Sequence, residues 1–261
     1  MRDTYRRYRA RAQCLLQRSP QVGGHQRRHL ATLALLICGM VGSQPTHLPQ
    51  VVAQTPGGRA ADERVVLRFR RWLTHDNVTS KRWMLPVARA LIAMLGRRPL
   101  VFVIDGSTVG RVCMGLMISG LYQRRALPIT WIVVQARNGH RPDARHWARL
   151  EPLAPRVPAE ASGTILGDGE YDGADGQAAM TARGWKYGCR TASNILLTLA
   201  EATSAIGDRA PKRGEVSAVE QVCITAAQYG LVNVLAVGEA ADEHPIHLVT
   251  THTDLEYALA L

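Results

Sequence analysis

Two aspartates in this chain stand directly after short apolar runs. Asp105 follows the run 100–104, and Asp168 follows the run 164–167. Both runs have the apolar and β-branched composition of a buried strand, so the sequence predicts that each carboxylate stands where a strand ends. Two such strands side by side would bring the carboxylates to one edge of a sheet. Carboxylate oxygens are the ligands that Mg²⁺ prefers, so the pattern predicts a divalent cation site.

A single aspartate after a strand has a simpler explanation, because its side chain commonly satisfies backbone donors in a turn or at a helix start. The prediction of a metal site therefore depends on Asp105 and Asp168 together. Asp172 and Asp175 fit the simpler explanation, and we expect them to cap a helix that begins near Ala174.

The elements that must position the two aspartates are short strands and two helices. We predict strands at 100–105, 112–121, 127–135, 163–168 and 185–190, and helices at 142–153 and 174–183. Three antiparallel strands, a crossover helix and a fourth strand beside the first give the ribonuclease-H order. The predicted fold class is therefore α/β, a ribonuclease-H-like mixed sheet spanning 98–261. A β-rich insertion is expected at about 191–245, around strand-like pieces at 219–225 and 231–237.

The first hundred residues have a different composition. Residues 1–27 read as a basic arm, and 28–97 as a helical domain. The run 30–41 is too short to cross a membrane and predicts a buried helix, with Leu30, Ala34, Ile37 and Val41 on one face. Further helices are expected at 61–75 and 81–95. The first of these places Arg64, Arg68 and Arg71 on one face at helical spacing.

Charge divides the chain in the same way. Residues 1–100 hold 18 Lys and Arg against 4 Asp and Glu, a balance of +14, whereas residues 101–261 hold 14 against 17, a balance of −3. A basic first part attracts a polyanion, and Arg64, Arg68 and Arg71 are candidate contacts to the phosphates of double-stranded DNA. The common alternative for a row of charged residues on a helix is a face exposed to solvent. The five scattered cysteines lack zinc-ligand spacing and indicate a reduced, cytoplasmic protein.

The stretch between the two aspartates resembles a known family. Tyr122, Arg125, Ala126, Leu127, Pro128 and Trp131 match the Tyr-x-x-Arg-Ala-Leu-Pro-x-x-Trp run of DDE transposases of the insertion-sequence-4 type. The segment 167–172 is similar to the second-aspartate block of that family. The resemblance implies Mg²⁺- or Mn²⁺-dependent strand cleavage and strand transfer in DNA transposition and recombination, with Asp105 and Asp168 as catalytic metal ligands. It implies element ends and target DNA as partners, a bacterial, nucleoid-associated location and no membrane, and leaves a homodimer open.

One feature departs from that family. Its members carry a third catalytic carboxylate in a final Tyr-x-x-Arg-x-x-x-Glu helix, whereas here the segment 254–261 resembles only the approach to that helix, and Glu256 does not match the catalytic position. We therefore expect a transposase without its last catalytic segment. The alternative is a catalytically inactive fragment that acts only as a DNA-binding protein.

Overall fold

The computed structural model describes residues 24–43, 47–55, 62–95, 99–109, 113–123, 125–135, 163–169, 171–200, 202–238 and 244–261, with isolated positions before residue 15. The chain divides into two compact units, Met1–Ala90 and Leu91–Leu261. The predicted helix 142–153 and most of the predicted arm 1–27 lie outside the described residues.

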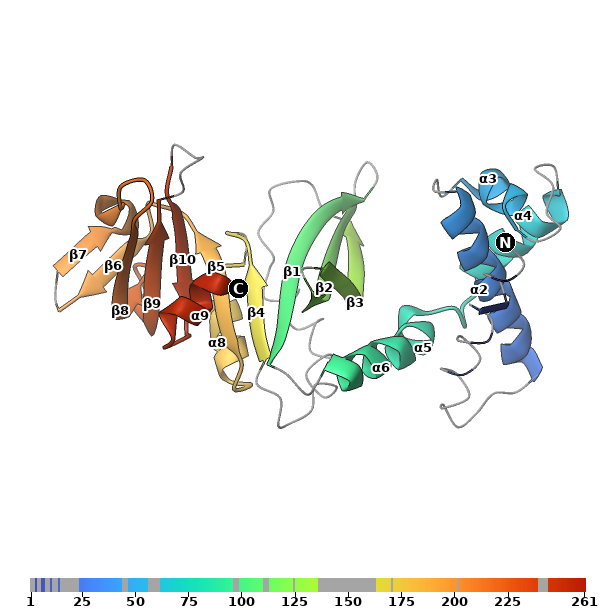
Figure 1. Cartoon of the computed structure of the whole chain (residues 1–261), viewed down its shortest axis with the longest axis horizontal. Coiled ribbons are helices and arrows are strands. Elements are labelled where there is room, and N and C mark those ends of the chain that lie inside the picture. The colour runs from blue at the N-terminus through green and yellow to red at the C-terminus, as the bar shows by residue number, and fades with distance from the viewer. Residues whose placement is uncertain are drawn as a thin grey trace. The chain divides into compact units, whose positions relative to one another are not determined.

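The first unit consists of helices (Figure 1): α2 (Gly24–Ser43), α3 (Leu48–Ala53), α4 (Glu63–Leu73), α5 (Ser80–Trp83) and the start of α6 (Leu85–Leu95). Its core joins residues from α2 to α5, namely Leu30, Leu36, Val51, Val52, Phe69, Trp72 and Trp83. No helix in the described part of the chain is long and apolar enough to cross a membrane.

Two details of these helices differ from the sequence prediction. Leu30 and Ala34 are buried as predicted, but Ile37 is only partly buried and Val41 is 57% exposed. The buried side of α2 also includes Leu36, Cys38 and Gly39. A Cβ on Gly39 would overlap the carbonyl oxygen of Val51, so α3 packs against this point of α2. The expected helix 81–95 is broken between α5 and α6, because Pro86 has no N–H to continue the hydrogen-bond ladder.

The second unit contains a mixed sheet (Figure 1). Its order is β3-β2-β1-β4-β5-β10-β9-β8-β6-β7. The strands of its first half are β1 (Leu100–Val109), β2 (Cys113–Tyr122), β3 (Arg125–Gln135), β4 (Gly163–Gly167) and β5 (Lys186–Thr191). The first three are antiparallel, and β4 and β5 run parallel to β1. This order confirms the predicted ribonuclease-H-like α/β fold class.

The remaining strands continue the same sheet beyond β5. They are β6 (Leu196–Leu199), β7 (Ala202–Ala205), β8 (Val216–Ile224), β9 (Tyr229–Val237) and β10 (Ile246–Thr250), with a 3₁₀ turn, η2 (Ile206–Arg209), after β7. Strand β10 pairs with β5 on one side and with β9 on the other. The stretch 191–245 thus contributes strands that add to the core sheet through β10.

One side of the core sheet is buried by regular alternation. Leu100, Phe102 and Ile104 of β1 point to this side, and Tyr187 and Cys189 are the buried residues of β5. Helix α8 (Ala174–Thr181) packs on β5 here, and the Tyr187 hydroxyl donates to Gln177 Oε1 at 2.6 Å. The chain leaves α8 through Gly184, whose φ of +70° favours glycine, and enters β5. These contacts hold α8 on β5, which pairs with β4.

Candidate active site

Asp105 lies within β1 rather than at its end. The predicted strand ended at residue 105, but β1 continues to Val109 because it remains paired with β2, up to the pair Val109 and Cys113. Alternation turns Asp105 away from the buried Ile104, and its side chain is exposed. The hydroxyl of Ser107, two residues on along the same face, lies 3.4 Å from Asp105 Oδ2 as a long hydrogen-bond donor.

Asp168 directly follows the last residue of β4 and is also exposed. Parallel pairing joins Val101 with Thr164 and Val103 with Leu166, so the same offset places Asp105 level with Asp168. Neighbouring strands lie about 4.8 Å apart, which is the expected spacing of the two backbones where this pairing ends. A turn closed by the bond from Tyr171 N to the Asp168 carbonyl oxygen, 3.0 Å long, fixes the backbone at this point.

A basic side chain, Arg190, continues this row on the next strand. The pair Gly167 and Cys189 joins β4 to β5, and Arg190 follows Cys189 just as Asp168 follows Gly167. Arg190 is exposed. Sequence reasoning missed it, because only the strand register brings it level with Asp168, 22 positions away in the chain. The site thus offers two carboxylates for a cation and a guanidinium for a phosphate oxygen.

A hydrogen bond between side chains joins β5 to the segment before α8. Asp172 Oδ2 accepts from Thr191 Oγ1 at 2.7 Å, so the prediction that Asp172 caps α8 is wrong: Gly173 occupies the N-cap, and no side chain caps the helix. Asp175 lies in the first turn of α8, exposed, and also makes no cap bond. Burial, followed by the charge of Asp172, raises the pKa of Cys189 to about 12, so this thiol stays protonated at neutral pH.

The C-terminal segment contacts the opposite end of β4. Thr164 Oγ1 and His252 Nε2 are hydrogen-bonded at 3.0 Å, four residues before Asp168, which is about 13 Å along a strand. Helix α9 (Leu255–Ala260) follows, capped by Asp254, whose Oδ1 accepts from Tyr257 N at 2.9 Å. Glu256 lies in the first turn of α9 and is exposed.

The pair of carboxylates is compatible with a hard divalent cation. Mg²⁺ is commonly held by one or two carboxylates and completes its shell with waters and substrate phosphates, which the exposure of Asp105 and Asp168 permits. Within the described ranges, no group of three or more His, Cys, Asp or Glu side chains is placed to hold a metal ion. The fit therefore rests on these two carboxylates.

The three arginines predicted to contact DNA belong to the first unit and have different surroundings. Arg64 and Arg71 are exposed on α4. Arg68 donates from Nε and Nη2 to the buried Thr32 Oγ1 of α2, at 3.0 and 2.7 Å. Arg68 thus helps to join α4 to α2, whereas Arg64 and Arg71 project into solvent.

Comparison with known proteins gives structural similarity alone. No protein-family model matches the chain, and no curated protein matches it in sequence. Among solved structures, it is similar to the piggyBac transposase in a synaptic complex with hairpin DNA, with a TM-score of 0.41 and 10% identity, over 96% of this chain and 52% of that one. It is also similar to human endonuclease V, with a TM-score of 0.34 and 14% identity, over 67% of this chain and 87% of that one. The chain spans about half the length of the transposase.

Proposed function

We propose that this protein is a metal-dependent DNA strand transferase of the DDE type, acting in transposition of an insertion sequence. The observation that supports the proposal is the parallel register between β1 and β4, whose last pair, Val103 and Leu166, comes two residues before Asp105 and Asp168. The Arg-Ala-Leu-Pro run that carries the family resemblance lies at the start of β3, two strands away. Double-stranded DNA is the proposed substrate.

The roles of the residues follow from their chemistry. Asp105 and Asp168 would hold Mg²⁺ or Mn²⁺ through their carboxylate oxygens. A divalent cation supplies activation of a water or 3′-hydroxyl and stabilisation of the leaving oxygen. Ser107 orients the carboxylate of Asp105 through its long hydrogen bond. Arg190, on the next strand, would hold an oxygen of the scissile phosphate, for which the forked guanidinium is suited.

A second candidate function is DNA binding without catalysis. It is favoured by the finding that, in the described part of the chain, no third carboxylate or histidine joins Asp105 and Asp168 in a metal-binding group. In that case the exposed arginines of α4 would carry the activity, and the aspartate pair would be a remnant of the catalytic site.

A metal titration combined with a cleavage assay separates the two candidates. Mn²⁺ binding would be measured by calorimetry, and cleavage of supercoiled DNA in Mg²⁺ or Mn²⁺ would be followed on gels. We expect Asp105→Asn and Asp168→Asn each to abolish Mn²⁺ binding and to lower any cleavage by at least about a thousandfold, because the transition state loses several kcal/mol of charge stabilisation. Asp175→Asn is the matched control, since Asp175 is exposed on α8 in the same unit.

The outcomes assign the function directly. Metal binding and cleavage that both depend on Asp105 and Asp168 support the transferase. Tight DNA binding without Mn²⁺ binding or cleavage supports the non-catalytic protein. Cleavage that survives Asp105→Asn would overturn the proposed site.

A further inference from the structure

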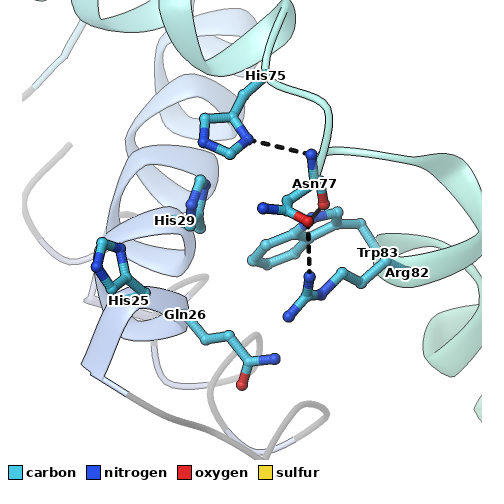
Figure 2. Close-up of a pocket in the computed structure, with 7 residues that line it drawn as sticks. All are labelled: His25, Gln26, His29, His75, Asn77, Arg82 and Trp83. Atoms are coloured by element: carbon cyan, nitrogen blue, oxygen red, sulfur yellow. Dashed lines mark hydrogen bonds between the residues drawn. The ribbon is translucent and has the colours of Figure 1, made fainter.

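A second candidate site lies in the helical unit. It is a pocket of about 280 Å³ between the first turns of α2 and the segment that runs from the end of α4 into α5. Figure 2 shows His25 and His29 on α2, with His75, Asn77 and Arg82 across from them. Its volume is close to the lower limit of ordinary small-ligand sites, about 300 Å³, so it suits one small group.

The side chains around this pocket favour an anion. Three imidazoles and one guanidinium line it, together with two amides and the indole of Trp83, and no Asp or Glu is among the lining residues. The first turn of α2 also contains no acidic residue, so no carboxylate within that turn neutralises the partial positive charge at the start of the helix. Histidine and arginine donate hydrogen bonds that a tetrahedral oxyanion accepts.

Two buried polar atoms of the lining residues lack a hydrogen-bond partner. His29 Nδ1 and Gln26 Oε1 are buried, and neither makes a hydrogen bond in the structure. His75 Nδ1 accepts from Asn77 N at 3.1 Å, so its proton lies on Nε2, which remains a donor. Rotation of the Gln26 amide exchanges its oxygen for its NH₂ group. Buried polar atoms are normally satisfied, and a ligand in the pocket would satisfy these.

The surroundings of His29 in the pocket lower its pKa. Burial lowers the pKa of His29, and the positive charges of His75, His25 and Arg82 lower it further. The rings of His29 and His75 meet edge to face, with centroids 5.0 Å apart. The pKa of His29 is therefore below its ordinary value, and a bound anion would raise it.

We propose that the pocket formed by His25, His29, His75 and Arg82 binds a phosphate group and holds it more tightly as the pH falls. A metal ion fits less well, because these imidazoles do not form a metal-binding group. The phosphate is either a free anion or a backbone phosphate of DNA. In the second case the inference rests on the proposed function and adds a pH-dependent DNA contact to it.

The test uses the full chain and the imidazole NMR signals of its histidines. Inorganic phosphate and a short DNA duplex are titrated separately at pH 6 and pH 7.5. We expect the pKa of His29 to rise when the pocket is filled, and affinity to be about threefold higher at pH 6 than at pH 7.5, because a rise of about one pKa unit gives at most about tenfold over the whole titration. Free phosphate gains negative charge as the pH rises, so tighter binding at low pH would come from the protein.

His29→Gln keeps a polar side chain but removes the titration of residue 29, and it should reduce the pH dependence of binding. His47→Gln is the matched control, because His47 is exposed in the same unit and does not line the pocket. If His29→Gln does not fold, Arg82→Gln tests the same pocket, since Arg82 is exposed and its loss should weaken binding at both pH values.

The response of the His29 signals to the two probes tests the proposed phosphate site. A response of His29 to both probes supports a general phosphate site, and a response to DNA alone assigns the phosphate to the DNA backbone. His29 signals that ignore both probes, or binding that is equal in wild type and His29→Gln at both pH values, would overturn the proposal. Metal binding at Asp105 and Asp168 is measured independently, so failure here leaves the transferase proposal intact, and the reverse also holds.

Discussion

Val103 of β1 pairs with Leu166 of β4, and two residues further along each strand come Asp105 and Asp168. Val103 and Leu166 are the last pair between these two strands, and beyond Val103 strand β1 pairs with β2 alone. The two carboxylates therefore stand where the sheet narrows, exposed to solvent yet fixed by the strands that precede them.

The first prediction concerns the spacing of the two aspartates. A Cβ on Gly167 would come within 2.9 Å of Tyr171 Cβ and 3.1 Å of Ile104 Cγ2. Gly167→Val should push the end of β4 away from β1 and weaken Mn²⁺ binding, although both carboxylates remain. A misplacement of about 1 Å can cost about a hundredfold in rate, so DNA cleavage should fall by that order. Gly173→Ala is the control, since a Cβ there meets nothing within 4 Å. Equal metal affinity in both variants would contradict the prediction.

The second prediction separates DNA contacts from structural ones among the arginines of α4. Arg64→Ala and Arg71→Ala should lower DNA affinity, and each should reduce the slope of log K against log salt by about 0.9 if it releases one counterion. Arg68→Ala should instead lower the free energy of unfolding by about 1 kcal/mol, because it loses its bonds to Thr32. Anisotropy across a salt series and urea unfolding measure the two effects. An unchanged salt slope for Arg64→Ala and Arg71→Ala would show that this face is merely solvated.

The third prediction concerns the contact that holds α8 on the sheet. Tyr187 and Gln177 are both 1% exposed and joined by a 2.6 Å hydrogen bond. Burial raises the pKa of Tyr187, so its hydroxyl stays protonated and donates at any physiological pH. Tyr187→Phe leaves Gln177 Oε1 without this donor and should cost about 1–3 kcal/mol in urea unfolding. Tyr122→Phe should change little, because Tyr122 is 41% exposed. Equal stability of the two variants would show that Gln177 finds another donor.

The fourth prediction concerns stability against pH. Burial lowers the pKa of His247, and His247 Nε2 is buried without a hydrogen-bond partner in the structure. The unfolded chain then binds a proton at higher pH than the folded chain does. The stability that neutral His247 contributes is therefore fully present above pH 6.5, the ordinary pKa of histidine. It is lost as the pH falls from 6.5 through the lower pKa that His247 has in the folded chain. Urea unfolding at pH 7.5 and 5.5 should show the loss, and His247→Leu should reduce it. A loss that is just as large in His247→Leu would assign it to other groups.

Local pattern was sufficient to predict β1 to β5, though not the full length of β1, together with the fold class and the position of Asp168 at the end of β4. The apolar runs before Asp105 and Asp168 alternate or continue as strands do, and a strand pattern depends only on residues next to one another in the chain. The i, i+4 spacing of His25 and His29 could likewise have indicated a shared helix face. His75, which completes their pocket, comes from another element and gives no such signal.

Tertiary structure alone decided which side chains from distant parts of the chain became neighbours. Register brings Arg190 level with Asp168, and pairing with β2 extends β1 past Asp105, neither of which is encoded in a neighbouring residue. Thr191 donates a hydrogen bond to Asp172, so Asp172 does not cap α8. Arg68 donates to Thr32, although helical periodicity alone placed Arg68 on the same face as Arg64 and Arg71. The physical reason is the same in each case: polar side chains take the partner that folding brings within hydrogen-bond distance, and the sequence specifies only which side chains are available.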